Sequence, residues 1–395
     1  MKVVYFILVL VFLAPLLAIG NISFTQTGLD QQGSSILQYL WTIFILVFFF
    51  ISLFPPLAYR MQSFFITRDI RDKLMILEKF AFEAKSKTEK LLSDKGVKDA
   101  KQIVDSVSEF FTIEPVSIEP TDIIKRLSHV LRTGEDKVRK MIEMASPNID
   151  SVSRSKIETA LEITNALNLI YKVVRHYLIL AEKLKNFYLL AQLQMVVPLI
   201  VRQAEAYAKA MDPFIKGKPV GDSIGPLIAS RFLAKAERKW VVERDTIAGE
   251  VYFEGRKLII VKAEGPSSTV GRPGIAIEKI VEENKGRVSR IITVDAALKL
   301  EGEQSGTIAE GVGAAIGDPG PEKIAIERVA ANNQIPLDAI VIKMSYEEAI
   351  QEMKKEIYDA ADKVVEYIKT IVKERTKEGD TIIIAGIGNS VGVAQ

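Results

Sequence analysis

The residues best suited to chemistry in this chain are glycines, hydroxyls and acids that follow predicted strands. Three such segments are Glu264–Gly274, the glycine-rich Gly302–Gly320 that comes shortly after Asp295, and the C-terminal Gly386–Gly392. Glycines let backbone N–H groups close around an anion, and a helix N-terminus adds a favourable dipole. The pattern therefore predicts a site for a phosphate-bearing small molecule, such as a nucleotide, in a regulatory or sensor module.

The candidate ligand-binding residues are distributed over these three segments. They are Gly265, Ser267, Ser268, Thr269, Gly271, Arg272, Gly274, Asp295, Gly311, Gly313, Gly317, Gly386, Gly388 and Gly392. No single motif is specific, because turn geometry or close packing also explains each run of glycines. The spacing before Arg272 differs from that of a P-loop, and no dinucleotide fingerprint follows it. The prediction depends on all three segments meeting at one edge of a sheet.

A fourth candidate segment, Gly217–Pro226, connects two predicted domains. It contains Gly217, Gly221, Asp222 and Gly225. In one interpretation it is a rigid turn in which Asp222 caps the next helix. In the other it contributes to the ligand cleft.

Two passages, Gly217–Pro226 and Ala309–Asp318, resemble an archaeal family of membrane-anchored proteins of unknown function. The likeness extends over most of the chain after the membrane segments. It implies an archaeal source and a shared fold. It implies no activity, substrate or catalytic residue.

An enzyme that uses the same cleft is the main alternative. Asp295, Glu303, Glu310 and Asp318 would then be metal ligands or acid–base groups, since carboxylates beside phosphates commonly hold Mg²⁺. A structural scaffold is a further alternative, because long amphipathic helices favour self-association into a homo-oligomer.

Composition excludes several classes of site. The chain has no cysteine, so it has no thiol nucleophile, disulfide or zinc–thiolate centre. His129 and His176 lie on different predicted helices without a second histidine at ligand spacing, so no metal site is predicted from them. The 52 basic and 50 acidic residues are interspersed, which argues against a nucleic-acid partner. No cofactor is indicated.

Residues 241–395 alternate between strand and helix patterns. Strands are predicted at 247–253, 256–263, 288–294, 337–344 and 381–385, and helices at 275–284, 321–333 and 346–377. Ser345 and Glu348 form a predicted capping box at the start of the last helix. The first two strands form a hairpin through Glu254–Gly255, and the alternation afterwards indicates a mainly parallel sheet. Loops at the carboxyl ends of parallel strands converge, which places the candidate segments together.

Residues 61–240 have helical periodicity throughout and are predicted to form an all-helical domain. The helix pattern from Ser151 to Met211 is too long for one straight helix, so breaks are expected near Asn186 and Pro198. Phe187–Val201 is the most apolar stretch of this domain. It is predicted to be a buried helix of the bundle, with a re-entrant or interfacial segment as the alternative.

Residues 1–60 are predicted to anchor the chain in the cell membrane. Two uncharged segments, 3–20 and 36–59, are each long enough to cross a hydrocarbon core of about 30 Å. Basic residues flank them on one side, at Lys2 and from Arg60 onward, which places the N-terminus and the main body in the cytoplasm. A cleaved signal peptide is the alternative for the first segment. The predicted fold class is therefore α + α/β, with a transmembrane helical hairpin, a helical domain and an α/β domain.

Overall fold

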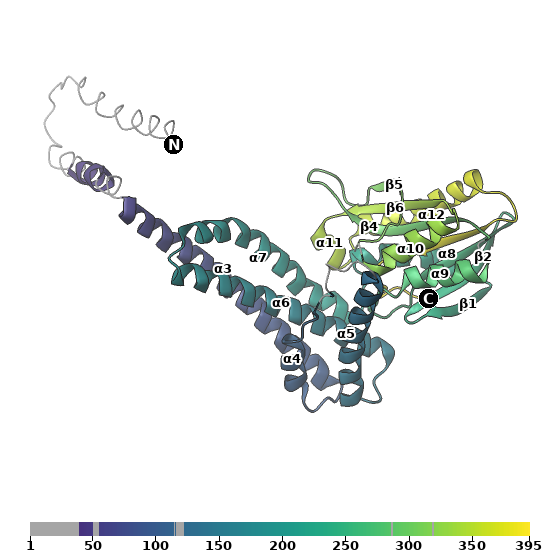
Figure 1. Cartoon of the computed structure of the whole chain (residues 1–395), viewed down its shortest axis with the longest axis horizontal. Coiled ribbons are helices and arrows are strands. Elements are labelled where there is room, and N and C mark those ends of the chain that lie inside the picture. The colour runs from purple at the N-terminus through teal and green to yellow at the C-terminus, as the bar shows by residue number, and fades with distance from the viewer. Residues whose placement is uncertain (1–38, 50–54, 114, 116–121, 286, 318–319) are drawn as a thin grey trace, which may run out of the picture. The chain divides into compact units, whose positions relative to one another are not determined.

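The computed structural model describes residues 39–49, 55–113, 115, 122–285, 287–317 and 320–395. The chain divides into two compact units, Met1–Phe65 and Ile66–Gln395. In the second unit a run of helices comes first, and a part in which strands and further helices alternate follows it, as the labels in Figure 1 show. A helical N-terminal part and a C-terminal part with a mixed sheet therefore confirm the predicted fold at the level of α and β content.

The predicted membrane hairpin falls largely outside the described residues. Segment 3–20 lies wholly outside them, and segment 36–59 is described only in part. Within that part, Tyr39–Phe49 is a short apolar helix. Among the described residues, α7 (Phe187–Lys216) is the one helix long and apolar enough to cross a membrane. The hairpin and the signal-peptide alternative therefore stay predictions.

The helical part contains five helices among the described residues from 55 to 217. They are α3 (Pro55–Asp94), α4 (Ala100–Ser108), α5 (Ile123–Ala145), α6 (Ser151–Lys183) and α7. The predicted break near Asn186 is confirmed, because the Asn186 side chain accepts a hydrogen bond from Leu189 N (3.1 Å) and caps α7. The predicted break at Pro198 is wrong, since α7 continues through it. A helix end was also predicted at Gly134, and this prediction is wrong because Gly134 lies inside α5.

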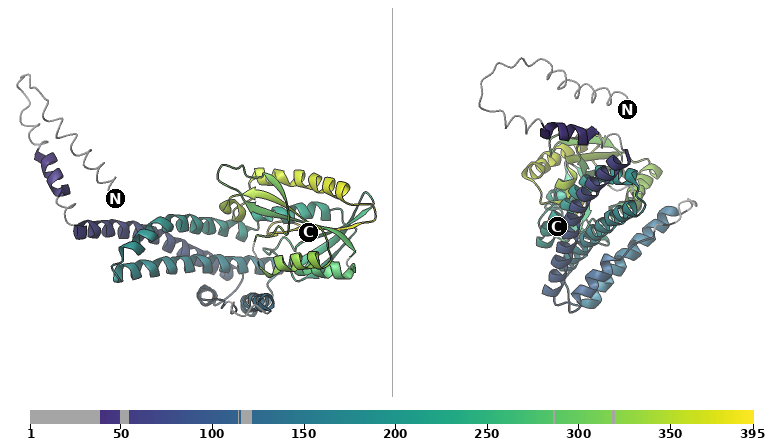
Figure 2. Two further views of the ribbon diagram at one scale, coloured as in Figure 1. Left: turned by 45° about the horizontal axis from the view of Figure 1, so that its top comes forward. Right: turned by 90° about the vertical axis from the view of Figure 1, so that its left-hand side faces the viewer.

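Helices α6 and α7 form a long hairpin that packs beside α3 (Figure 2). Ile70 and Leu77 of α3 meet Leu167 and Leu178 of α6 in one apolar cluster. The prediction of a buried helix at Phe187–Val201 holds only in part. Leu190 and Val197 are buried, whereas many of its other large apolar side chains are exposed.

The C-terminal part is a seven-stranded sheet with the order β1-β2-β3-β7-β4-β6-β5. The strands are β1 (Arg238–Glu243), β2 (Thr246–Phe253), β3 (Arg256–Ala263), β4 (Val288–Leu298), β5 (Ile308–Val312), β6 (Leu337–Met344) and β7 (Thr381–Gly386). The central strands β3, β7, β4 and β6 are parallel, and the outer pairings are antiparallel. Both Glu254 (φ 42°) and Gly255 (φ 73°) have positive φ, which is the geometry of a tight hairpin turn, so the predicted hairpin is confirmed.

Helices cover both faces of this sheet. The remaining elements are η1 (Gly221–Ser223), α8 (Ile224–Leu233), α9 (Pro273–Glu283), α10 (Pro321–Asn332), α11 (Tyr346–Ile350) and α12 (Lys355–Arg375). One core cluster joins α8 and α12 to the sheet, and another joins α9 and α10 to its other face. The last strand, β7, belongs to both cores: Ile382 and Ile384 face one, and Ile383 and Ala385 face the other. The chain therefore completes its sheet with its final strand.

Three elements differ from the predicted pattern. Strand β1 was not among the predicted strands, and its first residues fall in the stretch that was predicted to be all-helical. Strand β5 at the edge of the sheet was expected to be part of a glycine-rich loop, and its partly exposed residues show no clear alternation. The helix predicted at 346–377 is divided into α11 and α12. Its capping box is confirmed, since Ser345 and Glu348 bond each other's backbone N–H groups. The division has a tertiary cause: Met353 N donates to Pro219 O (2.9 Å), which draws the backbone out of the helix.

Candidate functional site

The loops at the carboxyl ends of β3 and β7 meet, and the terminal loop Gly386–Gly392 lies between its neighbours. The buried Ser390 hydroxyl is within hydrogen-bond distance of the carbonyl oxygens of Glu264 (3.0 Å), Ser267 (2.9 Å) and Thr269 (3.1 Å). On the other side of this loop, Asn389 N donates to the Asp222 carboxylate (2.7 Å). The structure therefore brings the segment after β3, the C-terminal loop and the segment 217–226 to one place.

Most of the candidate glycines in these segments face neighbouring backbone. A Cβ atom on Gly265 would lie 1.9 Å from Val393 O, one on Gly388 would lie 2.1 Å from Asp222 O, and one on Gly225 would lie 2.1 Å from Ile387 O. The same crowding, with an atom within 3.0 Å, is found at Gly217, Gly221, Gly271, Gly274, Gly386 and Gly392. These glycines allow backbone segments to pack together, so protein atoms occupy much of the space predicted for a ligand.

The remaining three candidate glycines have open surroundings. An added Cβ on Gly311, Gly313 or Gly317 would meet no atom within 4 Å. Gly311 belongs to β5, and the segment after it turns back along β4, where Ala315 N donates to the Thr293 hydroxyl (2.8 Å). Of the candidate glycines, which all lie within the described residues, these three have open space beside the backbone.

The predicted anion site at the start of α9 is filled by the protein itself. Gly274 N and Ile275 N both donate to the Glu322 carboxylate, at 2.8 and 3.3 Å. The Arg272 guanidinium faces Glu135 and Glu243, at 3.4 and 3.7 Å. Both the N–H donors and the cation of the predicted phosphate loop therefore already have carboxylate partners.

The hydroxyls of the same loop are also engaged. Ser268 N donates to the Ser155 hydroxyl of α6 (3.0 Å), and the Ser268 hydroxyl lies 2.7 Å from that of Thr159. Gly271 N donates to the Thr269 hydroxyl (3.1 Å). This segment connects the sheet to α6.

Two aspartates form the most unusual feature at this edge. Asp295 comes directly after Val294 of β4, and Val294 pairs with Gly386 of β7. Three residues after Gly386, Asn389 N donates a hydrogen bond to the Asp222 carboxylate. The position of β7 next to β4 therefore brings together two acids that are 73 residues apart in sequence. Asp295 is only 4% exposed, and Asp222 is half-buried.

Among the residues that the structure describes, the direct hydrogen-bond donors to this pair are backbone N–H groups. Ala296 N donates to Asp295 Oδ1 (2.7 Å), and the N–H of Gly317 also bonds this carboxylate. Burial raises the pKa of Asp222. Burial, followed by the nearby charge of Asp222, raises the pKa of Asp295 well above its usual value. Among the described residues, no lysine or arginine contributes to either shift. Two carboxyl groups in this situation titrate as a pair, because the charge of each disfavours ionisation of the other.

The other acids that were candidates lie in different surroundings. Glu303 forms an ion pair with Lys343, and Glu310 bonds Tyr367 and Arg375. Asp318 lies outside the described residues. Among those that are described, no three histidines or acids gather as metal ligands would. From the sequence, Asp222 and Asp295 were placed in different candidate segments. Their proximity follows from the strand order, in which β7 lies next to β4.

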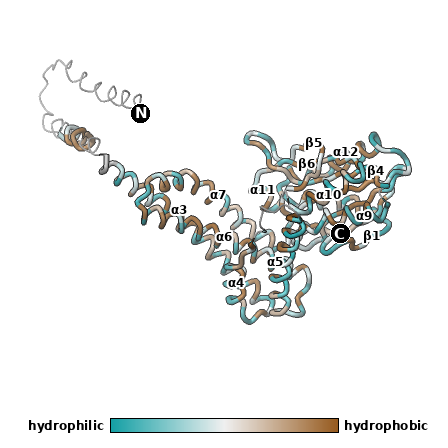
Figure 3. The backbone as a smooth tube through the Cα atoms, in the orientation of Figure 1, coloured by the Kyte–Doolittle hydropathy of each residue, from teal (hydrophilic) through white to brown (hydrophobic). Residues whose placement is uncertain are grey.

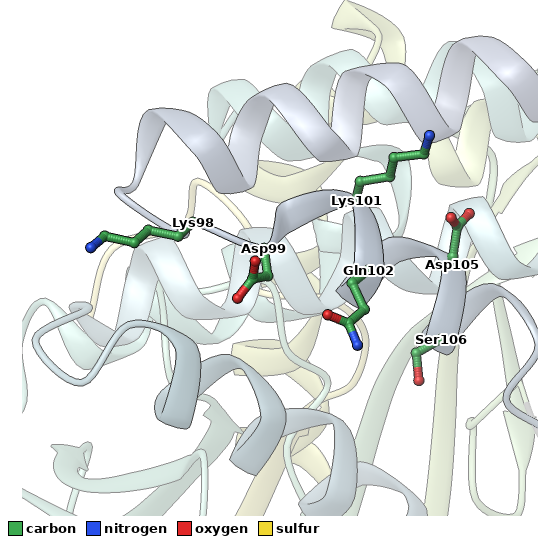
Figure 4. A pocket seen from close by; sticks show the side chains of 6 residues that line it. All are labelled: Lys98, Asp99, Lys101, Gln102, Asp105 and Ser106. Carbon is green, nitrogen blue, oxygen red and sulfur yellow. The ribbon is translucent and has the colours of Figure 1, made fainter.

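The described surface has two hollows, and neither is lined by Asp222 or Asp295. The larger, of about 610 Å³, is an open hollow beside α4 whose exposed lining side chains point in different directions (Figure 4). The smaller, of about 30 Å³, lies between α5, α6 and the segment after β3. Its Arg139 is bound to Glu158 and Asp245, both at 3.0 Å, so the charges there are compensated.

Comparison with protein families places both aspartates within the match to a single family model. Residues 43–217 match the model described as "Protein of unknown function (DUF1512) N-terminal domain". Residues 220–394 match "Domain of unknown function (DUF1512) C-terminal", which includes Asp222, Asp295 and β7. No curated protein matches the chain.

Proposed function

Because the chain belongs to the DUF1512 family of unknown function, we propose from its site alone that the C-terminal domain is a hydrolase in which Asp222 and Asp295 activate water. The observation that carries this proposal is the buried pair of carboxyl groups without a compensating cation. Perturbed acids at the carboxyl ends of parallel strands are typical of functional sites. A purely structural role is less favoured, because two carboxylates that repel each other destabilise the folded protein.

The two carboxyl groups suit different roles. Asp295 is the more buried and is the one whose pKa is raised furthest, so we assign to it the proton that the pair would share. Asp222 is the more exposed of the two residues, so we assign to it the role of the base. In the proposed reaction Asp222 takes a proton from water, the water oxygen bonds to the acyl carbon, and Asp295 gives its proton to the carbonyl oxygen, which yields a tetrahedral diol. The carbon–nitrogen or carbon–oxygen bond then breaks as Asp222 passes its proton to the leaving group, and one hydroxyl of the diol returns a proton to Asp295 as the carboxylic acid product forms.

Water is the nucleophile that the surrounding residues favour. The chain has no cysteine. Ser390, the serine closest in sequence to Asn389, is fully buried and its hydroxyl is held by three carbonyl oxygens. Paired aspartates that share a proton are known to hydrolyse peptide bonds, so an amide or peptide bond is the substrate class that we propose.

A second candidate retains the predicted phosphate-bearing ligand. Mg²⁺ binds commonly through one or two carboxylates together with substrate phosphates, and Asp222 and Asp295 supply two. The open backbone at Gly313 and Gly317 beside this pair supports such a ligand. In this version the domain is a metal-dependent enzyme or a ligand-binding module. Either activity would be tethered to the cell membrane by segments 3–20 and 36–59, with the body in the cytoplasm.

Peptide hydrolysis in H₂¹⁸O tests the first candidate. The full-length protein in mild detergent is incubated with a mixture of peptides, and mass spectrometry searches for new C-termini that carry ¹⁸O. We expect cleavage by the wild type and loss of cleavage in Asp222→Asn and Asp295→Asn. Glu303→Gln is the matched control, since Glu303 is half-buried and pairs with Lys343 of β6, a strand that is not adjacent to β7.

The divalent cation separates the two candidates. Cleavage that persists in EDTA supports the metal-free pair. Binding or turnover of a nucleotide that requires Mg²⁺ and disappears in both aspartate variants supports the second candidate. Absence of peptide cleavage by the wild type, or cleavage that survives both substitutions, contradicts the proposed hydrolase.

A further inference from the structure

The end of the α6–α7 hairpin exposes an unusual number of large apolar side chains. We call residues 169–199 the hairpin end; it comprises the last part of α6, the connection 184–186 and the first part of α7. Tyr188 is 80% exposed, Met195 70%, Leu199 66% and Leu184 61%. Much of this hairpin is coloured as hydrophobic in Figure 3. An apolar surface of this kind marks an interaction site.

Burial of α7 changes along its length. Of its most apolar 18-residue window, only 22% is buried in the protein, whereas a core helix of a soluble bundle is mostly buried. Further along the helix, Ala206, Ala210, Met211 and Phe214 are packed inside the protein. The C-terminal half of α7 therefore packs in the protein core, whereas the apolar side chains of its N-terminal half are left for contact with another molecule.

The charge of the hairpin end identifies that partner. Between Ile163 and Ala204 the sequence has five basic residues and one acid. The acid, Glu182, is neutralised by Arg71 of α3, with 2.7 Å between the charged groups. In the connection, Lys183 and Lys185 are exposed on either side of Leu184. Exposed apolar residues flanked by basic ones match the surface of an anionic bilayer.

A second copy of this chain fits the same surface less well. A self-association through the hairpin end would bring two sets of basic residues together, and their repulsion would oppose it. Tyrosines are common where protein meets the lipid headgroups, and Tyr177 and Tyr188 are both exposed here. The Arg71–Glu182 ion pair also fixes the hairpin end to α3 only eleven residues after Arg60, where the predicted membrane segment has just ended.

We propose that the hairpin end docks onto an anionic membrane surface. Leu184, Tyr188, Met195 and Leu199 enter the boundary between headgroups and acyl chains, and Lys183 and Lys185 contact anionic headgroups. This contact is made by the unit Ile66–Gln395 and does not depend on the aspartate pair. It gives the protein a membrane contact additional to the predicted segments 3–20 and 36–59.

Site-directed spin labelling tests the proposal, because the chain has no cysteine of its own. Tyr188→Cys is labelled in the full chain, which is reconstituted into vesicles of phosphatidylcholine and phosphatidylglycerol. Val312→Cys, at a 93% exposed position of β5, is the matched control, and Leu184→Cys repeats the test if Tyr188→Cys misfolds. We expect collisions with oxygen to exceed collisions with a water-soluble nickel complex at position 188, and the reverse at position 312.

Charge reversal then tests the lipid preference. Lys183→Glu with Lys185→Glu should reduce the oxygen preference at position 188 in vesicles that contain phosphatidylglycerol. A label at 188 that is as accessible to the nickel complex as the control overturns the proposal. So does a label that is already shielded from both reagents in detergent, since a protein surface then covers it. Alkaline extraction tests the predicted membrane segments separately, so failure of the anchor and failure of the docking surface are distinguishable.

Discussion

Two buried aspartates on neighbouring strands of the sheet have opposite surroundings. Asp338 of β6 is bound by the Arg290 guanidinium (2.6 Å) and faces Arg375 (3.6 Å). Asp295 of β4 has backbone N–H donors and the second carboxylate of Asp222. One acid is compensated by cations, as expected of a structural ion pair, and the other has a like charge beside it. Both acids are buried, so burial alone does not distinguish a structural residue from a candidate for catalysis. The charge of the neighbouring group does.

The largest expected difference between these two acids is in activity. Asp295→Asn and Asp222→Asn should each reduce hydrolysis by about 1,000-fold, within the range for loss of a general acid or base. Asp338→Asn should leave the activity of the folded fraction within a few-fold of wild type. The rate of ¹⁸O incorporation per folded molecule measures this. Equal losses of activity in all three variants would contradict the distinction between a structural Asp338 and a catalytic pair.

The next largest effect concerns stability, and here Asp338 is the sensitive residue. Removal of its charge in Asp338→Asn leaves Arg290 without its carboxylate in a site where the Arg290 side chain is only 15% exposed. Breaking a buried ion pair in this way commonly costs about 3–5 kcal/mol of the free energy of unfolding. Urea unfolding in mild detergent provides the measurement. A control, Asp212→Asn, removes an exposed carboxylate whose partner Lys87 is also exposed, and it should cost less than about 1 kcal/mol.

Much of the fold that supports these two acids follows from local sequence. The hairpin at Glu254–Gly255 and the capping box at Ser345 depend on neighbouring residues, and the structure confirms both. The Asp222–Asp295 pair depends on β7 lying between β3 and β4, which is a contact between distant parts of the chain. Local patterns carry no such information. The crowding at Gly265 and Gly388 was equally hidden, because a sequence does not show whether a glycine faces a ligand or another backbone.

Lys262 extends the comparison to a buried base near the same edge of the sheet. It is fully buried on β3, opposite Gly386 of β7, and its ammonium donates to Ala263 O (2.8 Å). Burial lowers its pKa from 10.5 to about 8. This difference corresponds to about 3 kcal/mol of lost stability when both states are protonated. We therefore expect Lys262→Met to raise the free energy of unfolding by up to about 3 kcal/mol at neutral pH.

The pH dependence gives an independent check on Lys262. Between pH 8 and 10.5 the unfolded chain holds the proton and the folded chain has lost it, so wild-type stability should rise with pH in this window. The rise should be absent in Lys262→Met, and the two proteins should converge in stability above pH 10.5. A Lys262→Met protein that is less stable than wild type at pH 7 would show that the ammonium has a favourable partner.

The smallest expected effect is a gain of stability in Asp295→Asn. The pKa of Asp295 is raised in the folded state, so its charge opposes folding above that pKa. Below the unfolded value near 3.9 both states are protonated, and the unfavourable contribution is absent. It develops as the pH rises from there through the folded-state pKa and is complete above it. The substitution should therefore stabilise the protein at neutral pH by about 1–2 kcal/mol, a common gain when an unfavourable functional group is removed.

The sign of this change separates the two buried aspartates most directly. At neutral pH, Asp295→Asn should raise the midpoint of urea unfolding while Asp338→Asn lowers it, although both remove one buried carboxylate. At a pH below 3.9 the advantage of Asp295→Asn should disappear. In the double variant Asp222→Asn, Asp295→Asn, the second substitution should stabilise less than it does alone, because the like charge has already gone. Simple additivity in that double variant would mean that the two carboxylates do not interact, and the shared proton would then have no physical basis.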